Sequence, residues 1–423
     1  MTDDRLTTDI VELAARSRDA SRVLARLPAA ARTAALVEVA AAIEAQAPEI
    51  LAANRRDLEA ADERGVTGPM RDRLSLDEAG VAKLAAAVRE VAAQEDPLGA
   101  LEDEHVRPNG LRVARMRIPI GVVAMIYESR PNVTADAAAL CLRSGNAVIL
   151  RGGSEAVHSN RAIAEAVRAG IARTHVPVDA VQLVPTTDRA AVDVLLRQDD
   201  TVDLVIPRGG ESLIRAVTEK SRIPVLQHYK GVCHVFVDAS APSERASEIV
   251  FNAKVQRPGV CNALETLLVH EDAAPRALPG IARRLAEAGV ELRGCPRTLE
   301  LLSDLDVVPA TEADWREEYL DLILAIRVVH DLDEALSHID KYASGHTEAI
   351  VTDDKEEARR FVAAVQSSTV LVNASTRFAD GGELGLGAEI GISTSKLHAY
   401  GPMGARELTT RKFVVFGDGQ VRS

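Results

Sequence analysis

The first part of the chain has the hydrophobic pattern of consecutive helices. Between residues 8 and 64, alanine and leucine recur at helical spacing, and Pro28 and Pro48 stand where new helices can begin. Ser75-Leu76-Asp77-Glu78 has the form of a capping box and predicts a further helix that ends near Gln94. This part of the chain carries no obvious chemistry, so we interpret it as scaffold.

A β-hairpin is predicted next in the chain. Two extended runs, Glu102 to Arg107 and Leu111 to Ile118, flank Pro108-Asn109-Gly110, and Asn-Gly between extended runs favours a tight turn. Arginines alternate with apolar residues in the second run, so one face of the ribbon is polar. A projecting ribbon of this kind can pair with another subunit.

From residue 121 onward, short apolar runs alternate with helical segments. The first series predicts strands at 122–126, 147–150, 181–184 and 204–206, and helices at 134–143, 155–173, 188–197 and 211–220. The second series predicts strands near 233–237, 264–269, 322–329, 348–351, 369–373 and 412–416, and helices near 243–256, 275–288, 332–343 and 354–366. Such an alternation implies parallel, doubly wound sheets, which bind ligands at the carboxyl ends of their strands. We therefore expect an α/β protein with two such domains.

Composition narrows the possible classes of protein. The chain has 423 residues and a formal net charge of -13, which argues against a nucleic-acid binder and against docking on anionic membranes. No apolar run approaches the roughly 18 residues of a membrane span, and the N-terminus lacks a basic and then apolar signal segment. The four cysteines form no CxxC pair. We expect a cytoplasmic protein with reduced thiols and no metal.

Two glycine-rich turns follow predicted strands of the first domain. Arg151-Gly152-Gly153-Ser154 follows one strand, and Arg208-Gly209-Gly210 follows another. Neither is a GxGxxG fingerprint or a P-loop, and each alone is typical of a tight strand-to-helix turn. Because both lie at the same edge of one parallel sheet, a site for a phosphate-bearing ligand is as plausible as two structural turns.

Cys261 and Asn132 are the candidates for covalent chemistry. A lone cysteine is usually a small buried hydrophobe, but Pro258-Gly259 forces a turn that can present the Cys261 thiol at a domain edge. Lys254 and Arg257 are close in sequence and could favour the thiolate. Cys141 lies in an apolar helical pattern and Cys233 in a strand pattern, and we interpret these two and Cys295 as structural. Asn132 either caps a helix or supplies an amide donor to an oxyanion.

The whole chain resembles the aldehyde dehydrogenase superfamily. The most specific strings are Tyr127-Glu128-Ser129-Arg130-Pro131-Asn132-Val133-Thr134, Gln256-Arg257-Pro258-Gly259-Val260-Cys261-Asn262-Ala263-Leu264-Glu265-Thr266 and Gly391-Ile392-Ser393-Thr394-Ser395-Lys396-Leu397-His398. The segment from Val329 to Ile350, which includes Gly345-His346-Thr347-Glu348, adds to the resemblance. These strings are long and rare.

The resemblance implies roles for single residues. Cys261 is implied to be the nucleophile and Asn132 the oxyanion donor. Arg151 stands where the superfamily has a basic residue beside the adenine ribose, and Ser154 where NAD-preferring relatives often carry a glutamate. A serine beside an arginine would accept a 2′-phosphate, so the resemblance favours NADPH. Glu318 matches a glutamate near the nicotinamide ribose, and the two glycine turns belong to the cofactor site.

The resemblance is to the branch that reduces an acyl phosphate. Oxidising aldehyde dehydrogenases carry a water-activating glutamate, whereas the corresponding segment 225–231 has no carboxylate. The implied reaction is NADPH-dependent reduction of L-glutamate 5-phosphate to L-glutamate 5-semialdehyde in proline biosynthesis. Candidates for substrate binding, from their positions after strands, are Arg257, Ser375, Thr376 and Arg377.

The expected organisation has three parts. Residues 1–100 and 119–230 are expected to form a dinucleotide-binding domain, and residues 231–404 a catalytic thiol domain. By resemblance, residues 101–118 and 405–423 form an oligomerisation element, which implies a homo-oligomer. Two alternatives stay open at this point. One is an oxidase-type enzyme for another aldehyde, and the other is a catalytically idle dinucleotide-binding sensor or assembly subunit.

Overall fold

The computed structural model describes residues 2–128 and 130–422 and divides into two compact units. Unit 1 comprises residues 2–227, 385–392 and 403–422, and unit 2 comprises residues 228–384 and 393–402. Ser129 of the Tyr127–Thr134 string lies outside the described residues. No helix in the described part of the chain is long and apolar enough to cross a membrane.

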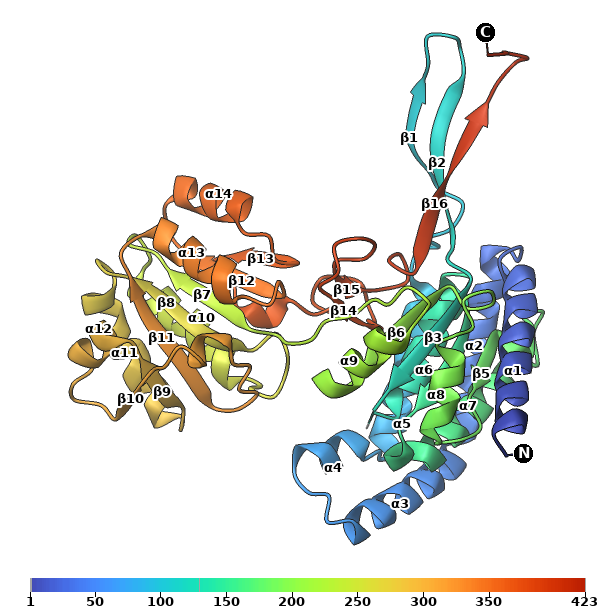
Figure 1. Ribbon diagram of the computed structural model, residues 1–423, viewed down its shortest axis with the longest axis horizontal. Coiled ribbons are helices and arrows are strands. Elements are labelled where there is room, and N and C mark those ends of the chain that lie inside the picture. The colour runs from blue at the N-terminus through green and yellow to red at the C-terminus, as the bar shows by residue number, and fades with distance from the viewer. Residues whose placement is uncertain (1, 129, 423) are drawn as a thin grey trace. The chain divides into compact units, whose positions relative to one another are not determined.

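Unit 1 is built on a parallel sheet of four strands in the order β5-β4-β3-β6 (Figure 1). The strands are β3 (Val122–Tyr127), β4 (Ala147–Gly152), β5 (Val181–Leu183) and β6 (Leu204–Arg208). Its helices are α1 (Thr2–Leu24), α2 (Ala29–Ala45), α3 (Ala47–Glu63), α4 (Pro69–Leu74), α5 (Glu78–Ala93), α6 (Asn132–Arg143), α7 (Val157–Ile171), α8 (Arg189–Leu195) and α9 (Glu211–Lys220). The predicted strand–helix alternation of this part of the chain is confirmed.

Side-chain alternation along the strands places helices on both faces of this sheet. Val122, Ala124 and Ile126 share one core cluster with Ile10 of α1 and Leu195 of α8. Because successive side chains of a strand point to opposite faces, the intervening residues of β3 face the other side, and all of them are buried. A strand covered on both faces must be apolar throughout, which explains the continuous hydrophobic runs in the sequence.

A three-stranded antiparallel sheet projects from unit 1 (Figure 1). It contains β1 (Leu101–Val106), β2 (Arg112–Pro119) and the C-terminal β16 (Thr409–Phe416), in that order. The predicted hairpin turn is confirmed: Gly110 has a φ of 83°, and the side chain of Asn109 accepts the Leu111 N–H at 3.3 Å. Only glycine adopts this backbone conformation without steric cost.

Unit 2 is built on a parallel sheet of seven strands in the order β10-β9-β11-β8-β7-β12-β13. The strands are β7 (Cys233–Val237), β8 (Leu264–His270), β9 (Glu291–Gly294), β10 (Val307–Pro309), β11 (Ile323–Val329), β12 (Thr347–Val351) and β13 (Thr369–Val372). The helices are α10 (Ser243–Val255), α11 (Ala274–Glu287), α12 (Pro296–Leu301), α13 (Leu332–Tyr342) and α14 (Lys355–Ala364). Short strands β14 (Gly391–Ser393) and β15 (Gly401–Met403) pair with each other.

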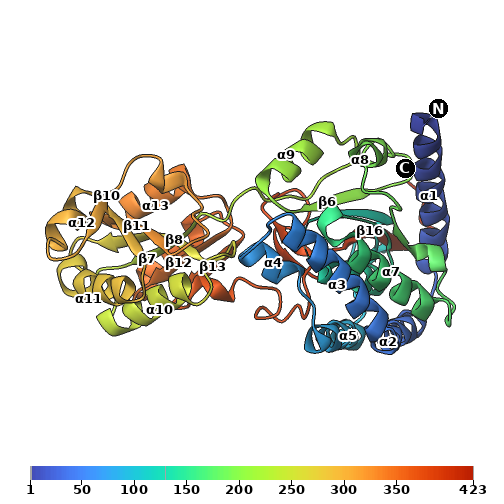
Figure 2. The ribbon, with the colours of Figure 1, turned by 90° about the horizontal axis from the view of Figure 1, so that it is seen from below.

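The sheet of unit 2 is also covered on both faces. Val235 and Val237 pack in one cluster with Val250 of α10 and Ile281 of α11. Phe236, between those two valines, packs in a different cluster with residues of α13 and α14. Figure 2 shows α10 and α11 on one side of this sheet and α13 on the other. The predicted fold class, two doubly wound parallel sheets plus a small β element, is therefore confirmed.

Several local predictions were wrong. Asp77, and not Ser75, caps α5 by accepting the Gly80 N–H, because Ser75 ends the preceding helix α4. Asn132 is not an N-cap but the first residue of α6, since Pro131 already has helical angles (φ −56°, ψ −33°). The sequence pattern also missed β9, β10 and α12, which are short.

Candidate active site

Cys261 lies in unit 2, on the loop that joins α10 to β8. The residue is half-buried, whereas Cys141 on α6 and Cys233 on β7 are fully buried. Burial raises the pKa of both buried thiols well above the usual range. Among these three cysteines, only Cys261 is not buried, so it is the candidate for a thiol that meets a ligand.

Gly231 packs directly against the backbone of Cys261. A Cβ atom at position 231 would lie 2.0 Å from the carbonyl oxygen of Cys261 and 2.8 Å from its Cα. The same carbonyl accepts a hydrogen bond from the Cys233 thiol at 3.2 Å. The segment before β7, which contains Gly231, therefore packs against the loop that carries Cys261. Only a residue without a side chain permits this close approach.

Two arginines accompany the thiol. The Nε of Arg377 donates to the side-chain oxygen of Gln256 at 2.7 Å, which fixes its guanidinium beside the loop. Burial lowers the pKa of Arg377, the charge of Arg257 lowers it further, and Cys261 is among the groups that raise it. Arg257 and Cys261 thus both act electrostatically on Arg377, and the two arginines favour an anionic ligand at this place.

Lys254 does not have the role that its sequence position suggested. Its Nζ is fully buried and lies 2.8 Å from a carboxylate oxygen of Glu265, which is also fully buried. Desolvation lowers the pKa of Lys254 and raises that of Glu265 to about 7. Because its charge is engaged in this fully buried pair, Lys254 is a poor source of thiolate stabilisation, contrary to what its sequence position suggested.

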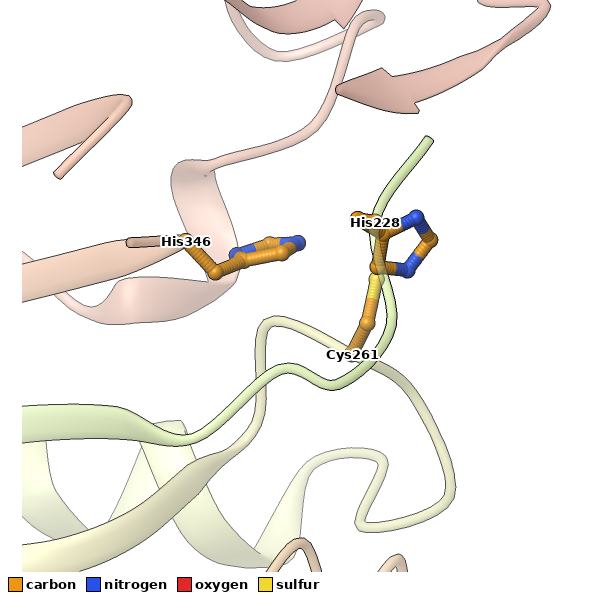
Figure 3. A group of neighbouring side chains, drawn as sticks. All are labelled: His228, Cys261 and His346. Carbon is orange, nitrogen blue, oxygen red and sulfur yellow. The ribbon is translucent and has the colours of Figure 1, made fainter. Parts of the chain in front are cut away.

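Two histidines, which the sequence reasoning did not assign, lie next to Cys261. One ligand atom from each of His228, Cys261 and His346 lies within 4.8 Å of the others. Figure 3 shows the ring of His346, which directly precedes β12, pointing toward Cys261 and His228. His346 is buried, and this burial together with the charge of His228 lowers its pKa to about 3, so its imidazole is neutral.

The remaining predicted residues of unit 2 lie close to this loop. The carboxylate of Glu318 accepts the N–H of Gly231 at 2.9 Å. Ser375 is buried, and its hydroxyl accepts the Arg377 N–H at 3.3 Å, so it shapes the turn that carries this arginine. Thr376 is fully buried, and its hydroxyl oxygen has no hydrogen-bond partner among the described residues.

Unit 1 contains a separate cavity of about 360 Å³ at the carboxyl ends of β3 and β4. Arg151, Gly153 and Ser154 line it, whereas Gly152, Gly209 and Gly210 do not. A Cβ on Gly152 would lie 2.1 Å from Asn160 and one on Gly209 2.4 Å from Glu128, whereas a Cβ on Gly210 would meet no atom within 4 Å. Apolar side chains of α8 and α9 line another wall of the cavity. Such a position is the usual ligand site of a doubly wound sheet.

Charged groups of both signs line this cavity. The guanidinium of Arg151 donates to the Thr187 carbonyl at 2.8 Å, while its buried Nε has no hydrogen-bond partner within residues 2–128 and 130–422. Burial lowers the pKa of Arg151, the charge of Glu155 raises it, and the charge of Arg189 lowers it. Arg189 and Glu155 are therefore neighbours of Arg151 that the sequence motif did not indicate. Glu128 also lines the cavity and accepts the Gly210 N–H at 3.0 Å.

Asn132 lies in unit 1, at the start of α6. Its Nδ2 donates to the carboxylate of Asp136 at 2.9 Å. Burial raises the pKa of Asp136 to about 6, although Arg208 and Asn132 lower it. An amide nitrogen has two hydrogens, so this bond occupies one and orients the other.

Comparison with known proteins shows which family has this architecture. Residues 4–293 match the aldehyde dehydrogenase family. The gamma-glutamyl phosphate reductase of Nitratidesulfovibrio vulgaris is 56% identical over 417 residues, which cover 99% of each chain. The crystal structure of gamma-glutamyl phosphate reductase from Thermotoga maritima has a TM-score of 0.95 at 48% identity and covers 98% of this chain and 100% of that chain. An acetylating aldehyde dehydrogenase from Geobacillus thermoglucosidasius, at 17% identity and a TM-score of 0.69 with 100% and 99% coverage, shares the fold.

The chain therefore belongs to the aldehyde dehydrogenase family, and within it to the gamma-glutamyl phosphate reductases. The resemblance that the motifs indicated is thereby confirmed.

Proposed function

We propose that this protein reduces L-glutamate 5-phosphate to L-glutamate 5-semialdehyde and phosphate with NADPH, through a thioester on Cys261, in cytoplasmic proline biosynthesis. The observation that carries the proposal is a half-buried cysteine within electrostatic range of Arg377, in a chain that is 56% identical to a gamma-glutamyl phosphate reductase over nearly its full length. Reduction of an acyl phosphate through a thioester needs a thiol and a site for the anionic phosphate, and the relatives are named for such a substrate. The thiol, the anion site and the named substrate therefore all support the same reaction.

Cys261 is the proposed nucleophile. Its sulfur attacks the C5 carbonyl of the acyl phosphate, the thiol proton leaves to solvent, and the bond to phosphate breaks. Arg257 and Arg377 suit the phosphate group because guanidinium groups bind phosphate oxygens in bidentate fashion. Phosphate is a good leaving group, so the residues around the thiol need to supply charge and orientation more than a proton.

The tetrahedral oxyanion needs hydrogen-bond donors. We assign this role to the backbone N–H of Cys261 and, from the family resemblance, to the amide of Asn132, whose orientation Asp136 constrains. A donor of this kind contributes about 10²–10³ in rate in acyl transfer. The residues 228–231 next to the thiol carry no carboxylate side chain, and a carboxylate is the base that activates water in the oxidising members of the superfamily that the chain resembles.

The cavity of unit 1 fits the adenosine end of NADPH. Its apolar wall suits a purine, and Arg151 and Arg189 suit a 2′-phosphate. The buried Nε of Arg151, for which the described part of the chain supplies no hydrogen-bond partner, offers one more donor. Glu155 and Glu128 line the same cavity and suit ribose hydroxyls. When bound, the dinucleotide would supply the hydride that adds to the thioester carbon, after which the carbon–sulfur bond breaks to release the aldehyde and return Cys261 as the thiolate. Glu318 is the proposed partner of the nicotinamide ribose.

The test is NADP-linked absorbance in the reverse direction with L-glutamate 5-semialdehyde, with and without phosphate. We expect sustained turnover only with phosphate, because phosphate is needed to release the acyl group from Cys261. Cys261→Ser should lose this turnover, while Cys295→Ser, which changes a half-buried cysteine elsewhere in unit 2, should retain it. Sustained aldehyde oxidation without phosphate, or an active Cys261→Ser variant, would overturn the proposal.

A further inference from the structure

We propose that His228, Cys261 and His346 together bind one Zn²⁺ ion, and that this ion silences the thiol reversibly. The three residues come from distant parts of the sequence of unit 2, and one donor atom of each lies within 4.8 Å of the others (Figure 3). One thiolate and two imidazoles form a ligand set that zinc prefers, with the fourth position left to water.

His346 has the features of a metal ligand. It is 1% exposed, and its Nε2 is buried with no hydrogen-bond partner among the described residues. Its Nδ1 lies 2.8 Å from the hydroxyl oxygen of Thr347. We assign the ring hydrogen to Nδ1, which donates to this hydroxyl, so that Nε2 carries the lone pair. Metal-bound histidines are oriented in this way by a partner on the other ring nitrogen.

The spacing of the donors is close to that of a zinc site. Tetrahedral coordination with ordinary bond lengths puts two imidazole nitrogens about 3.3 Å apart and a nitrogen and a sulfur about 3.6 Å apart. The observed separations of at most 4.8 Å approach these values after small side-chain rotations. Cys261 and His228 are only half-buried and can make that adjustment, whereas His346 is buried and its carbonyl accepts the Thr369 N–H at 3.1 Å.

The three donors also lie where an ion would affect function. Zinc bound to the sulfur replaces the thiol proton, which leaves to solvent, and no electron transfer is involved. The metal site stands on this geometry alone, whereas its inhibitory effect rests on the proposed thioester chemistry. A chelator would restore the thiol, so the ion would act as a reversible block.

Co²⁺ is the probe for the site, because cobalt replaces zinc and its thiolate complexes absorb in the near ultraviolet. We expect the reduced full-length protein to bind one Co²⁺ with a sulfur-to-cobalt band, and Zn²⁺ to abolish that band by displacement. Zn²⁺ should also protect Cys261 from alkylation, as measured by peptide mass spectrometry. A protein that develops no such band, or whose Cys261 alkylates equally fast with Zn²⁺, would overturn the proposal.

Variants assign the ligands. Cys261→Ser should lose the band, and His228→Gln should weaken Zn²⁺ binding by at least about tenfold, the smallest loss expected even for an outer-shell partner. His346→Gln changes a buried residue, so thermal unfolding is used to check that this variant folds. If it does not fold, the test rests on His228→Gln. Cys295→Ser and His270→Gln are the controls. A band that survives Cys261→Ser, or full affinity in His228→Gln, contradicts the assignment.

The spectroscopic result is independent of the reaction. If the band forms but Cys261→Ser retains turnover, the proposed function fails and the metal site stands. If the band does not form but turnover depends on Cys261 and phosphate, the metal site fails alone.

Discussion

Replacing Gly231 with alanine tests the support of the thiol loop without touching the thiol. The added Cβ would lie 2.0 Å from the carbonyl oxygen of Cys261, and ordinary contact begins near 3.4 Å. The loop must therefore move by about 1.4 Å, and a misplacement of about 1 Å can cost roughly 100-fold in rate. We expect kcat of Gly231→Ala to fall by about 100-fold in the phosphate-dependent assay.

Gly259→Ala is the matched control on the same loop. Its Cβ would meet only the Leu320 carbonyl oxygen, at 3.6 Å, which is ordinary contact. We expect this variant to keep most of its activity, and thermal unfolding shows whether either variant loses its fold. If folded Gly231→Ala turned over within about threefold of the parent protein, Gly231 would not position Cys261 in the way that we argue.

Three further predictions concern stability, the cofactor and assembly. Burial lowers the pKa of His338 to about 2 from an ordinary 6.5, so below pH 6.5 the unfolded chain takes up a proton that the folded chain refuses. This proton uptake should lower the free energy of unfolding by about 1.4 kcal/mol at about pH 5.5. Urea unfolding at about pH 7 and 5.5 should therefore show that His338→Gln loses less stability on acidification than the parent protein. Equal losses in the two proteins would refute the argument. Arg151→Ala should raise the Michaelis constant for NADPH much more than that for NADH, and equal effects would count against a 2′-phosphate contact. Phe413→Glu with Val415→Glu, which places charges at exposed apolar positions of the edge strand β16, should lower the mass measured by light scattering, whereas Val308→Glu on β10 should not; an unchanged mass contradicts the oligomerisation role.

The fold was predictable where hydrophobic periodicity and turn residues agree. Buried parallel strands must be apolar on both faces, so runs such as 122–126 stand out from the helices around them. The short strands β9 and β10 were missed because Glu291 and Arg293 interrupt one of them and the other has only three residues. The helix starts at Ser75 and Asn132 were misplaced by one or two residues, since more than one residue in each turn can cap a helix.

The candidate site was predictable only as far as local motifs reach. Pro258-Gly259 indicated an accessible Cys261, but its neighbours His228 and His346 lie in the segments before β7 and β12, and nothing in their sequence spacing relates them. Glu155 stands directly after Ser154, yet its place at the cavity depends on how its carboxylate folds over Gly153, where a Cβ would lie 2.2 Å from it. Such contacts follow from tertiary packing. A histidine just before a buried strand, as in Gly345-His346-Thr347, is the one local signal that could have drawn attention to His346.

The most direct test of the account is to trap the thioester. The protein is incubated with L-glutamate 5-semialdehyde and NADP⁺ without phosphate, quenched in acid and examined by peptide mass spectrometry. We predict one γ-glutamyl group on the peptide that contains Cys261, and its loss when phosphate is added before the quench. Turnover without any acyl group on Cys261, or an acyl group that phosphate does not release, would contradict the central claim.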